Sequence, residues 1–168
     1  MVIGNINTAT FEKWWLEKIG IYNNHFTNDA MFAGTYYEHK ILDSLWFPVE
    51  KDKQVILEDL KLRINLDGNT EDTIYEVKTY NIAKQFKVPI HYKRQVWVQM
   101  FGTGIRKAFI VAYGLKDNDY DNIFNPIEEE RIEPFEIEYN EQFITETYLP
   151  RLMYLSKCLS DGVFPCEI

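Results

Sequence analysis

The feature that most constrains this chain is an alternation of apolar and polar residues on both sides of an Asp-Gly dipeptide. Apolar residues occupy every second position of Leu60–Leu66, and the period of two returns in Thr73–Thr79. Successive side chains of a strand point to opposite faces of a sheet, so this period predicts two strands. Because both residues of an Asp-Gly pair tolerate positive φ, we expect a tight hairpin turn at Asp67 and Gly68.

This hairpin gathers polar side chains on one face. Glu76 and Lys78 are two positions apart and share a face, and antiparallel pairing can place Asp67 beside Glu76. Two neighbouring carboxylates repel each other unless a cation lies between them. Mg²⁺ and Mn²⁺ are hard cations that prefer such oxygen ligands. Either these residues form a cation site, or Asp67 is a simple turn residue and Glu76 and Lys78 belong to a solvated strand face.

A third carboxylate falls on the apolar face of a predicted helix, Asn28–Trp46, for which Asn28 is the expected N-cap. The expected buried face of this helix contains Met31, Gly34, Ile41, Leu42 and Leu45. Glu38 lies on the same face, and a carboxylate directed at a core is costly unless it meets a cation or hydrogen-bond donors. Glu38 is therefore either a site residue or an edge carboxylate that reaches water.

The other segments complete an α/β pattern. Further helices are predicted at Thr8–Ile19, Ile90–Thr103 and Asn140–Ser160, and further strands at Gln54–Leu57, Lys107–Gly114 and Ile132–Tyr139. We expect the three strands between residues 54 and 79 to form an antiparallel meander. The later strand–helix–strand unit is expected to be a right-handed crossover to a parallel strand. Asp117–Glu130 is acidic and rich in Asn, which predicts a solvated loop.

Length and composition limit the class of protein. The chain has 168 residues and 46% hydrophobic residues, without an internal repeat, so we expect a single globular domain over residues 1–168. No apolar run approaches the roughly 20 residues of a membrane span. The two Cys and three His are too few for a zinc or iron–sulfur set. Free thiols and the lack of a signal peptide predict a cytoplasmic protein without a membrane partner.

The charges are distributed unevenly. The formal net charge is −8, yet the segment from Val77 to Lys116 contains eight Lys and Arg residues and no Asp or Glu. The rest of the chain is strongly acidic. This pattern predicts either a face that meets an anion or a basic surface that pairs with acidic neighbours in the fold.

Several short segments, taken in order, carry a resemblance to a known family. They are Gly34-Thr-Tyr-Tyr-Glu38, Asp67-Gly68, Glu76-Val-Lys78, the segment Tyr92–Met100 with Gln95 and Gln99, and the closing Leu155–Pro165. This ordered set resembles the PD-(D/E)xK nuclease superfamily, and most closely its phage-type recombination exonucleases, the YqaJ-like and lambda-exonuclease-like proteins. The resemblance implies an α/β (α+β) fold with a restriction-endonuclease-like αβββαβ core. Helices would flank a mixed central sheet, with extra helices at both ends of the chain.

The resemblance also implies roles for individual residues. Mg²⁺, for which Mn²⁺ would substitute, is expected to be held by Asp67, Glu76, the Val77 carbonyl and Glu38. Lys78 would orient a water molecule or help to deprotonate it, and Gln95 would position that water or a phosphate. The residues expected to bind the DNA backbone are Lys84, Lys87, Lys93, Arg94 and Gln99.

The function that follows from the resemblance is a Mg²⁺-dependent DNA nuclease that hydrolyses phosphodiester bonds, as an exonuclease of phage-type recombination. Its setting would be the cytoplasm of a bacterium or of a phage-infected host cell. The implied partners are DNA, further copies of the chain, for which Trp14 and Trp15 offer a contact, and a single-strand annealing protein. Two alternatives stay open: an endonuclease of the same fold that acts on branched or foreign DNA, and a catalytically inactive DNA-binding or interaction module.

Overall fold

A computed structural model describes residues 2–23 and 29–166 of the chain, with the backbone alone at residues 29 and 30. It divides the chain into two compact units. Unit 1 consists of Met1–Phe26, Leu57–Leu62 and Asn140–Ile168, and unit 2 consists of Thr27–Ile56 and Arg63–Tyr139. The single domain expected over residues 1–168 stays a prediction.

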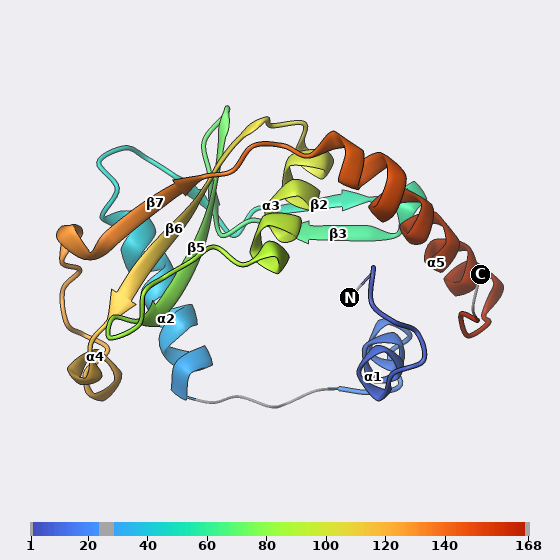
Figure 1. Cartoon of the computed structure of the whole chain (residues 1–168), viewed down its shortest axis with the longest axis horizontal. Helices are drawn as coiled ribbons and strands as arrows, with labels where there is room; N and C mark the ends of the chain where they lie inside the picture. Colours follow the sequence, from blue (N-terminus) through green and yellow to red (C-terminus); the bar gives the residue numbers. More distant parts are fainter. Residues whose placement is uncertain (1, 24–28, 167–168) are drawn as a thin grey trace. The chain divides into compact units, whose positions relative to one another are not determined.

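Unit 2 is built on a five-stranded sheet with the order β1-β4-β5-β6-β7, of which Figure 1 labels β5, β6 and β7. The strands are β1 (Glu50–Lys51), β4 (Gly68–Asn69), β5 (Thr73–Asn81), β6 (Lys107–Leu115) and β7 (Ile132–Glu136). β5 and β6 run parallel over nine residue pairs, and the other neighbours are antiparallel. The mixed sheet and the parallel crossover expected from the sequence are therefore confirmed.

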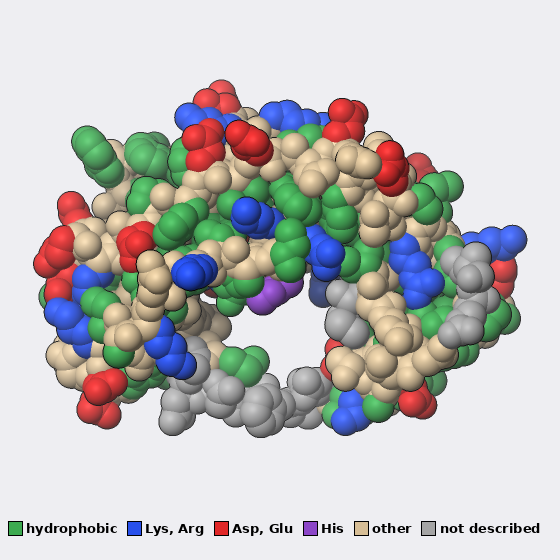
Figure 2. Space-filling view, viewed as in Figure 1, with side chains coloured by type: hydrophobic (Ala, Val, Ile, Leu, Met, Phe, Trp, Pro, Cys, Tyr) green, Lys and Arg blue, Asp and Glu red, His purple; other side chains and the backbone are tan. Residues whose placement is uncertain are grey.

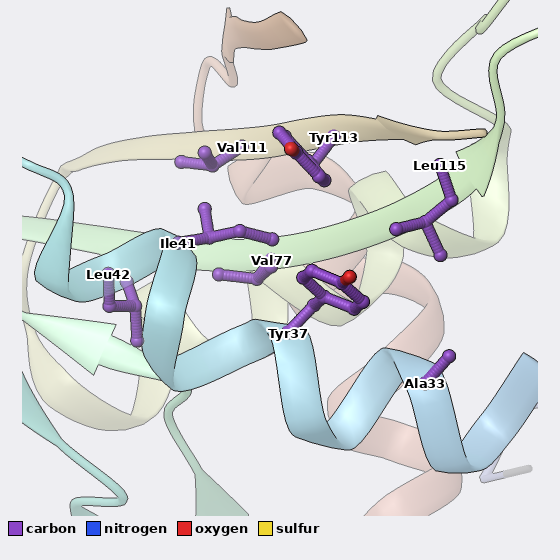
Figure 3. Close-up of a cluster of buried hydrophobic side chains, with 8 residues drawn as sticks. All are labelled: Ala33, Tyr37, Ile41, Leu42, Val77, Val111, Tyr113 and Leu115. Atoms are coloured by element: carbon purple, nitrogen blue, oxygen red, sulfur yellow. The ribbon is translucent and has the colours of Figure 1, made fainter. Parts of the chain in front are cut away.

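Helix α2 (Asp29–Asp43) covers one face of this sheet. Its buried side chains pack against Val77 of β5 and the alternate residues of β6 that point the same way (Figure 3). The rings of Tyr37 and Tyr113 stack with centroids 6.0 Å apart. The cluster consists of Ala33, Tyr37, Ile41, Leu42, Val77, Val111, Tyr113 and Leu115. Met31, predicted to be buried, is 50% exposed instead, because the inward stripe of the helix runs through Ala33 and Tyr37.

Helix α3 (Ile90–Thr103) contacts β5 and β6. Strand alternation places Glu76 on the face opposite to Val77, and it is Glu76 that α3 meets. The helix starts after Pro89 and ends at Gly104, whose φ of 79° is a left-handed C-cap conformation that glycine adopts without strain. The predicted helix Ile90–Thr103 is confirmed at both ends.

The meander and its turn were predicted wrongly. β2 (Gln54–Leu57) and β3 (Leu62–Asn65) form a separate two-stranded sheet, and the partner of β5 is the short strand β4. Asp67 and Gly68 do not form the turn; the chain reverses at Thr70–Asp72, where the Thr70 N–H donates to the Thr73 carbonyl at 2.9 Å. The Asp72 carboxylate accepts hydrogen bonds from the hydroxyls of Thr70 and Thr73, which stabilises this turn in place of Asp-Gly.

The segment after β6 is not the fully solvated loop that the sequence predicted. It forms the short helix α4 (Asp117–Asp121) and a 3₁₀ turn, Glu129–Arg131. Asp119 is buried and accepts a hydrogen bond from Arg131 at 2.5 Å. Burial alone would raise the pKa of Asp119, but the hydrogen bonds from Arg131 and the Lys116 N–H outweigh it and lower that pKa. The acidic composition of the segment led to the prediction of a solvated loop, because composition does not indicate that Asp119 pairs with Arg131.

Unit 1 contains α1 (Ala9–Lys18), a 3₁₀ turn at Glu58–Leu60, a π-helical turn at Phe143–Tyr148, and α5 (Leu149–Asp161). Thr8 caps α1 by accepting a hydrogen bond from the Phe11 N–H. Phe11 and Trp15 are buried with Leu155 and Cys158, so Trp15 belongs to the core of this unit. In the described part of the chain, no helix has the length and apolar character needed to cross a bilayer.

Gly68 generates a stability prediction, because a Cβ at this position would lie 2.7 Å from Val49 and 2.8 Å from Leu42. Both neighbours are in the packed interior between α2 and the sheet. We therefore expect Gly68→Ala to lower the free energy of unfolding by about 1–3 kcal/mol through overpacking. Chemical denaturation monitored by circular dichroism would measure this loss.

Gly34→Ala is the matched control. Gly34 lies inside α2, and a Cβ there would make an ordinary contact with the hydroxyl of Thr79 in β5, at 3.4 Å. Alanine is favoured over glycine in a helix by about 1 kcal/mol, so this variant should be as stable as the parent or more stable. Equal stability of the two variants would contradict the packing described for Gly68.

Candidate functional site

The centre of the candidate site is the carboxylate of Glu76, which is only 1% exposed. Three donors surround it. Lys78 on the same strand forms an ion pair with Oε1, Gln95 donates to Oε1 at 2.5 Å, and Gln99 donates to Oε2 at 2.6 Å. A buried charge is tolerated only when it is paired and hydrogen-bonded, and these contacts meet that condition.

Asp67 lies beside Glu76, as the sequence predicted, although it is not a turn residue. The register pairs Gly68 with Tyr75, which places the preceding Asp67 opposite Glu76. The Val77 N–H donates to the Asp67 carboxylate at 2.8 Å and fixes its orientation. Burial and the nearby carboxylates of Glu76 and Glu38 raise the pKa of Asp67 to about 8. The site therefore concentrates negative charge that a divalent cation would offset.

Glu38 reaches this charge cluster from α2. Burial and the Glu76 carboxylate raise the pKa of Glu38. Glu38 and Glu76 together raise the pKa of Asp67. Lys78 is the cation of the group. Burial lowers the pKa of Lys78, but the Glu76 carboxylate outweighs it, so the net shift is upward. Its Nζ also lies 5.0 Å from the centre of the Tyr92 ring, a cation–π contact that holds the ammonium in place.

A second group shares Glu38. Ligand atoms of Glu38, His39 and Asp52 all lie within 4.8 Å of one another, and His39 Nε2 is 2.9 Å from Asp52 Oδ2. Among the described residues, this is the sole trio of acidic or imidazole ligand atoms at that spacing. The oxygens of Glu38, Asp67 and Glu76 therefore do not all lie within 4.8 Å of one another. The Glu76 carboxylate is nonetheless close enough to raise the pKa of Asp67 and of Glu38. Sequence reasoning missed His39 and Asp52, since no spacing rule links α2 to the residue after β1.

The basic residues predicted to contact DNA differ in exposure. Lys84 and Lys87 are exposed in the segment between β5 and α3, whereas Lys93 and Arg94 are partly buried on α3. Figure 2 shows Lys and Arg side chains at the surface of one face of the molecule. Gln99 is 2% exposed, so it lies behind Glu76 and not on the surface where the predicted DNA contact would be.

Comparison with known proteins supports the fold. No protein-family model matches the chain, and no curated protein is significantly similar in sequence. The alkaline exonuclease LHK-Exo from Laribacter hongkongensis superposes with a TM-score of 0.64 at 17% identity, covering 96% of this chain and 88% of its own. A phage-related exonuclease from Haemophilus somnus 129PT gives a TM-score of 0.66 at 14% identity, covering 96% and 92%.

A further structure of LHK-Exo, in complex with dAMP, is similar to the chain with a TM-score of 0.63. At these identities the similarity establishes the fold and leaves the chemistry to the residues of this chain. The α/β architecture predicted from the sequence, with a mixed sheet flanked by helices, is confirmed. The resemblance to phage-type exonucleases is confirmed for the fold.

The charge cluster generates a prediction for Asp67→Asn. The asparagine can still accept the Val77 N–H and is neutral at every pH. Folding then no longer requires residue 67 to take up a proton or to keep a charge beside Glu76 and Glu38, which the raised pKa of Asp67 makes costly at neutral pH. In metal-free buffer at neutral pH we expect the free energy of unfolding to rise by about 1–3 kcal/mol. Mn²⁺ should then stabilise the wild-type chain more than the variant in thermal unfolding.

Glu71→Gln provides the control, because Glu71 is an exposed acid in the neighbouring turn. It should respond to Mn²⁺ like the wild-type chain. The same Mn²⁺ response in the Asp67→Asn variant would show that Asp67 is not a ligand.

Proposed function

We propose that this protein is a divalent-metal-dependent DNA nuclease that hydrolyses phosphodiester bonds, with Mg²⁺ as its metal. The observation that carries the proposal is the convergence of Asp67, Glu76 and Glu38, with the ammonium of Lys78 bonded to Glu76. Carboxylates near a lysine are the groups that metal-assisted phosphodiester hydrolysis requires. The similarity of the fold to two exonucleases supports the same reading.

The donor set fits a hard divalent cation. Asp67 and Glu76, with the Val77 carbonyl, would hold it, and Glu38 would complete the site directly or through water. The raised pKa of Asp67 supports this assignment, because burial and the carboxylates of Glu76 and Glu38 oppose its negative charge and a cation would offset them. A bound Mg²⁺ would supply Lewis-acid stabilisation of the charge on the scissile phosphate.

The chain's own residues supply the rest of the chemistry. Lys78 is held between Glu76 and the Tyr92 ring, so its ammonium can orient an attacking water and offset charge that develops on phosphate oxygens. Gln95 has an exposed side chain whose amide already reaches Glu76 Oε1, and it can position the water or a phosphate from the side of α3. Asp67, fixed by the Val77 N–H, needs no rearrangement to present its carboxylate.

Binding of DNA would use the basic residues beside this site. Lys84 and Lys87 are exposed in the segment that follows β5, the strand that carries Glu76 and Lys78. Lys93 and Arg94 start from the first half of α3, next to Gln95. Contacts of this kind neutralise backbone phosphates without reading sequence, which suits a nuclease that acts along a strand.

An exonuclease of phage-type recombination, acting in the cytoplasm of a bacterium or an infected host, is the form of this activity that we propose. Two of the similar structures are described as an alkaline exonuclease and as a phage-related exonuclease. Assembly into a homo-oligomer and cooperation with a single-strand annealing protein belong to the same proposal.

The direct test is degradation of linear duplex DNA in the presence of Mg²⁺ or EDTA. The wild-type chain should degrade linear DNA with Mg²⁺ or Mn²⁺ and be inactive in EDTA. Asp67→Ala and Lys78→Met should each reduce the rate at least about 100-fold, because each removes a group from the reaction centre. Wild-type activity of the Asp67→Ala variant would show that the reaction centre lies elsewhere.

Covalently closed circular DNA separates the two modes of cleavage. An exonuclease needs an end and should leave the closed circle intact, whereas an endonuclease would nick it. Metal binding without degradation of either substrate would favour an inactive DNA-binding module.

The basic residues generate a prediction for the salt dependence of DNA binding. Each phosphate contact contributes about 0.9 to the slope of log affinity against log salt concentration. Replacing both Lys84 and Lys87 by Ala should therefore reduce that slope by about 1 to 2, measured by fluorescence anisotropy with duplex DNA in EDTA. A double variant at Lys13 and Lys157, exposed lysines of unit 1, should keep the wild-type slope. A lower slope for the Lys13 and Lys157 variant, with an unchanged slope for the Lys84 and Lys87 variant, would indicate that DNA binds to unit 1.

A further inference from the structure

Gln99 occupies a position that is unusual for an amide side chain. It is 2% exposed on α3, one helical turn after Gln95 and directly before Met100, which is fully buried. Its Nε2 donates to Glu76 Oε2 at 2.6 Å and to the Asn65 carbonyl at 3.2 Å. One amide group therefore ties α3 both to the central carboxylate and to the end of β3.

The Oε1 atom of the same amide is buried, and in the described part of the chain it has no hydrogen-bond partner. A buried acceptor without a partner lowers the stability of the folded chain. Leu or Met would fill the same space without that cost. The hydrogen bond from Gln99 Nε2 to the Glu76 carboxylate therefore explains why an amide stands here despite its unpaired Oε1.

Gln95 and Gln99 both donate to Glu76, but their surroundings differ. The Gln95 side chain is exposed and free to change rotamer when a ligand arrives. Gln99 is enclosed, and its neighbours Val96 and Met100 are each 0% exposed. The contact of Gln99 with Oε2 is thus the more enclosed of the two amide contacts to the carboxylate.

We propose that Gln99 is a positioning residue, which locks the orientation of the Glu76 carboxylate so that it can bind a divalent cation. This inference rests on the proposed function and replaces the surface DNA contact expected for Gln99. Residues that orient metal ligands by hydrogen bonds commonly contribute 10- to 100-fold to metal affinity. We expect an effect of that size from Gln99.

The experiment compares Gln99→Met and Gln99→Asn with the wild-type chain. Met keeps the length and removes the donor, whereas Asn keeps an amide but is one methylene too short to reach Glu76. Two variants protect the test against a folding defect in one of them, which circular dichroism would reveal. Thr103→Val is the matched control, because Thr103 donates to the Gln99 backbone carbonyl at 2.8 Å on the same helix without contacting Glu76.

The readouts are Mn²⁺ binding by calorimetry, DNA binding in EDTA, and the Mg²⁺ concentration that gives the half-maximal rate. The folded Gln99 variants should bind Mn²⁺ about 10- to 100-fold more weakly and need correspondingly more Mg²⁺. Their DNA affinity in EDTA should be unchanged, since Gln99 does not reach the surface. Thr103→Val should stay within about twofold of the wild-type chain in metal affinity.

Two results would overturn the inference: Mn²⁺ affinity of both Gln99 variants within twofold of wild type, or a loss of DNA affinity in EDTA, which would restore a DNA contact. If the wild-type chain binds Mn²⁺ and degrades no DNA, the proposed function fails, and weaker binding by the variants still supports the role of Gln99. A wild-type chain that binds no Mn²⁺ overturns both.

Discussion

A single charged group, the buried carboxylate of Glu76, sets the arrangement of unit 2. It lies in β5, between β4 and β6, where water cannot solvate it. Its charge is tolerated because Lys78 pairs with it and because Gln95 and Gln99, four residues apart on one face of α3, both donate to it. The position of α3 along the sheet is therefore fixed by polar contacts as well as by the apolar side chains around them.

Much of this arrangement could be predicted from the sequence. Period-two alternation identified β5 and the shared face of Glu76 and Lys78, and the crossover rule gave the parallel pairing with β6. The apolar stripe of α2 singled out Glu38, which is half-buried and whose pKa is raised by burial and by the Glu76 carboxylate, while its role as a metal ligand stays a prediction. The meeting of Asp67 with Glu76 was predicted correctly from an incorrect turn.

The errors arose where long-range contacts outweigh local preference. Asp-Gly favours a turn, but Gly68 is needed where β4 passes within contact distance of Leu42 and Val49, and the turn formed at Thr70–Asp72. The burial of Gln99 behind Glu76 also depends on tertiary packing, as does the proximity of His39 to Asp52. Local sequence patterns carry no information about such partners, because each pair comes from separate elements.

The segment from α4 to Asn125 bears on the position of Glu38 through its contacts with α2. The Lys40 ammonium donates to the backbone carbonyls of Ile123 and Asn125, and the Tyr37 hydroxyl donates to that of Asp119 at 3.4 Å. These hydrogen bonds fix the orientation of α2 about its own axis. An inserted or deleted residue between Asp119 and Asn125 would shift these carbonyls, turn the helix and displace Glu38, so a surface segment without any proposed ligand helps to set the geometry of the site.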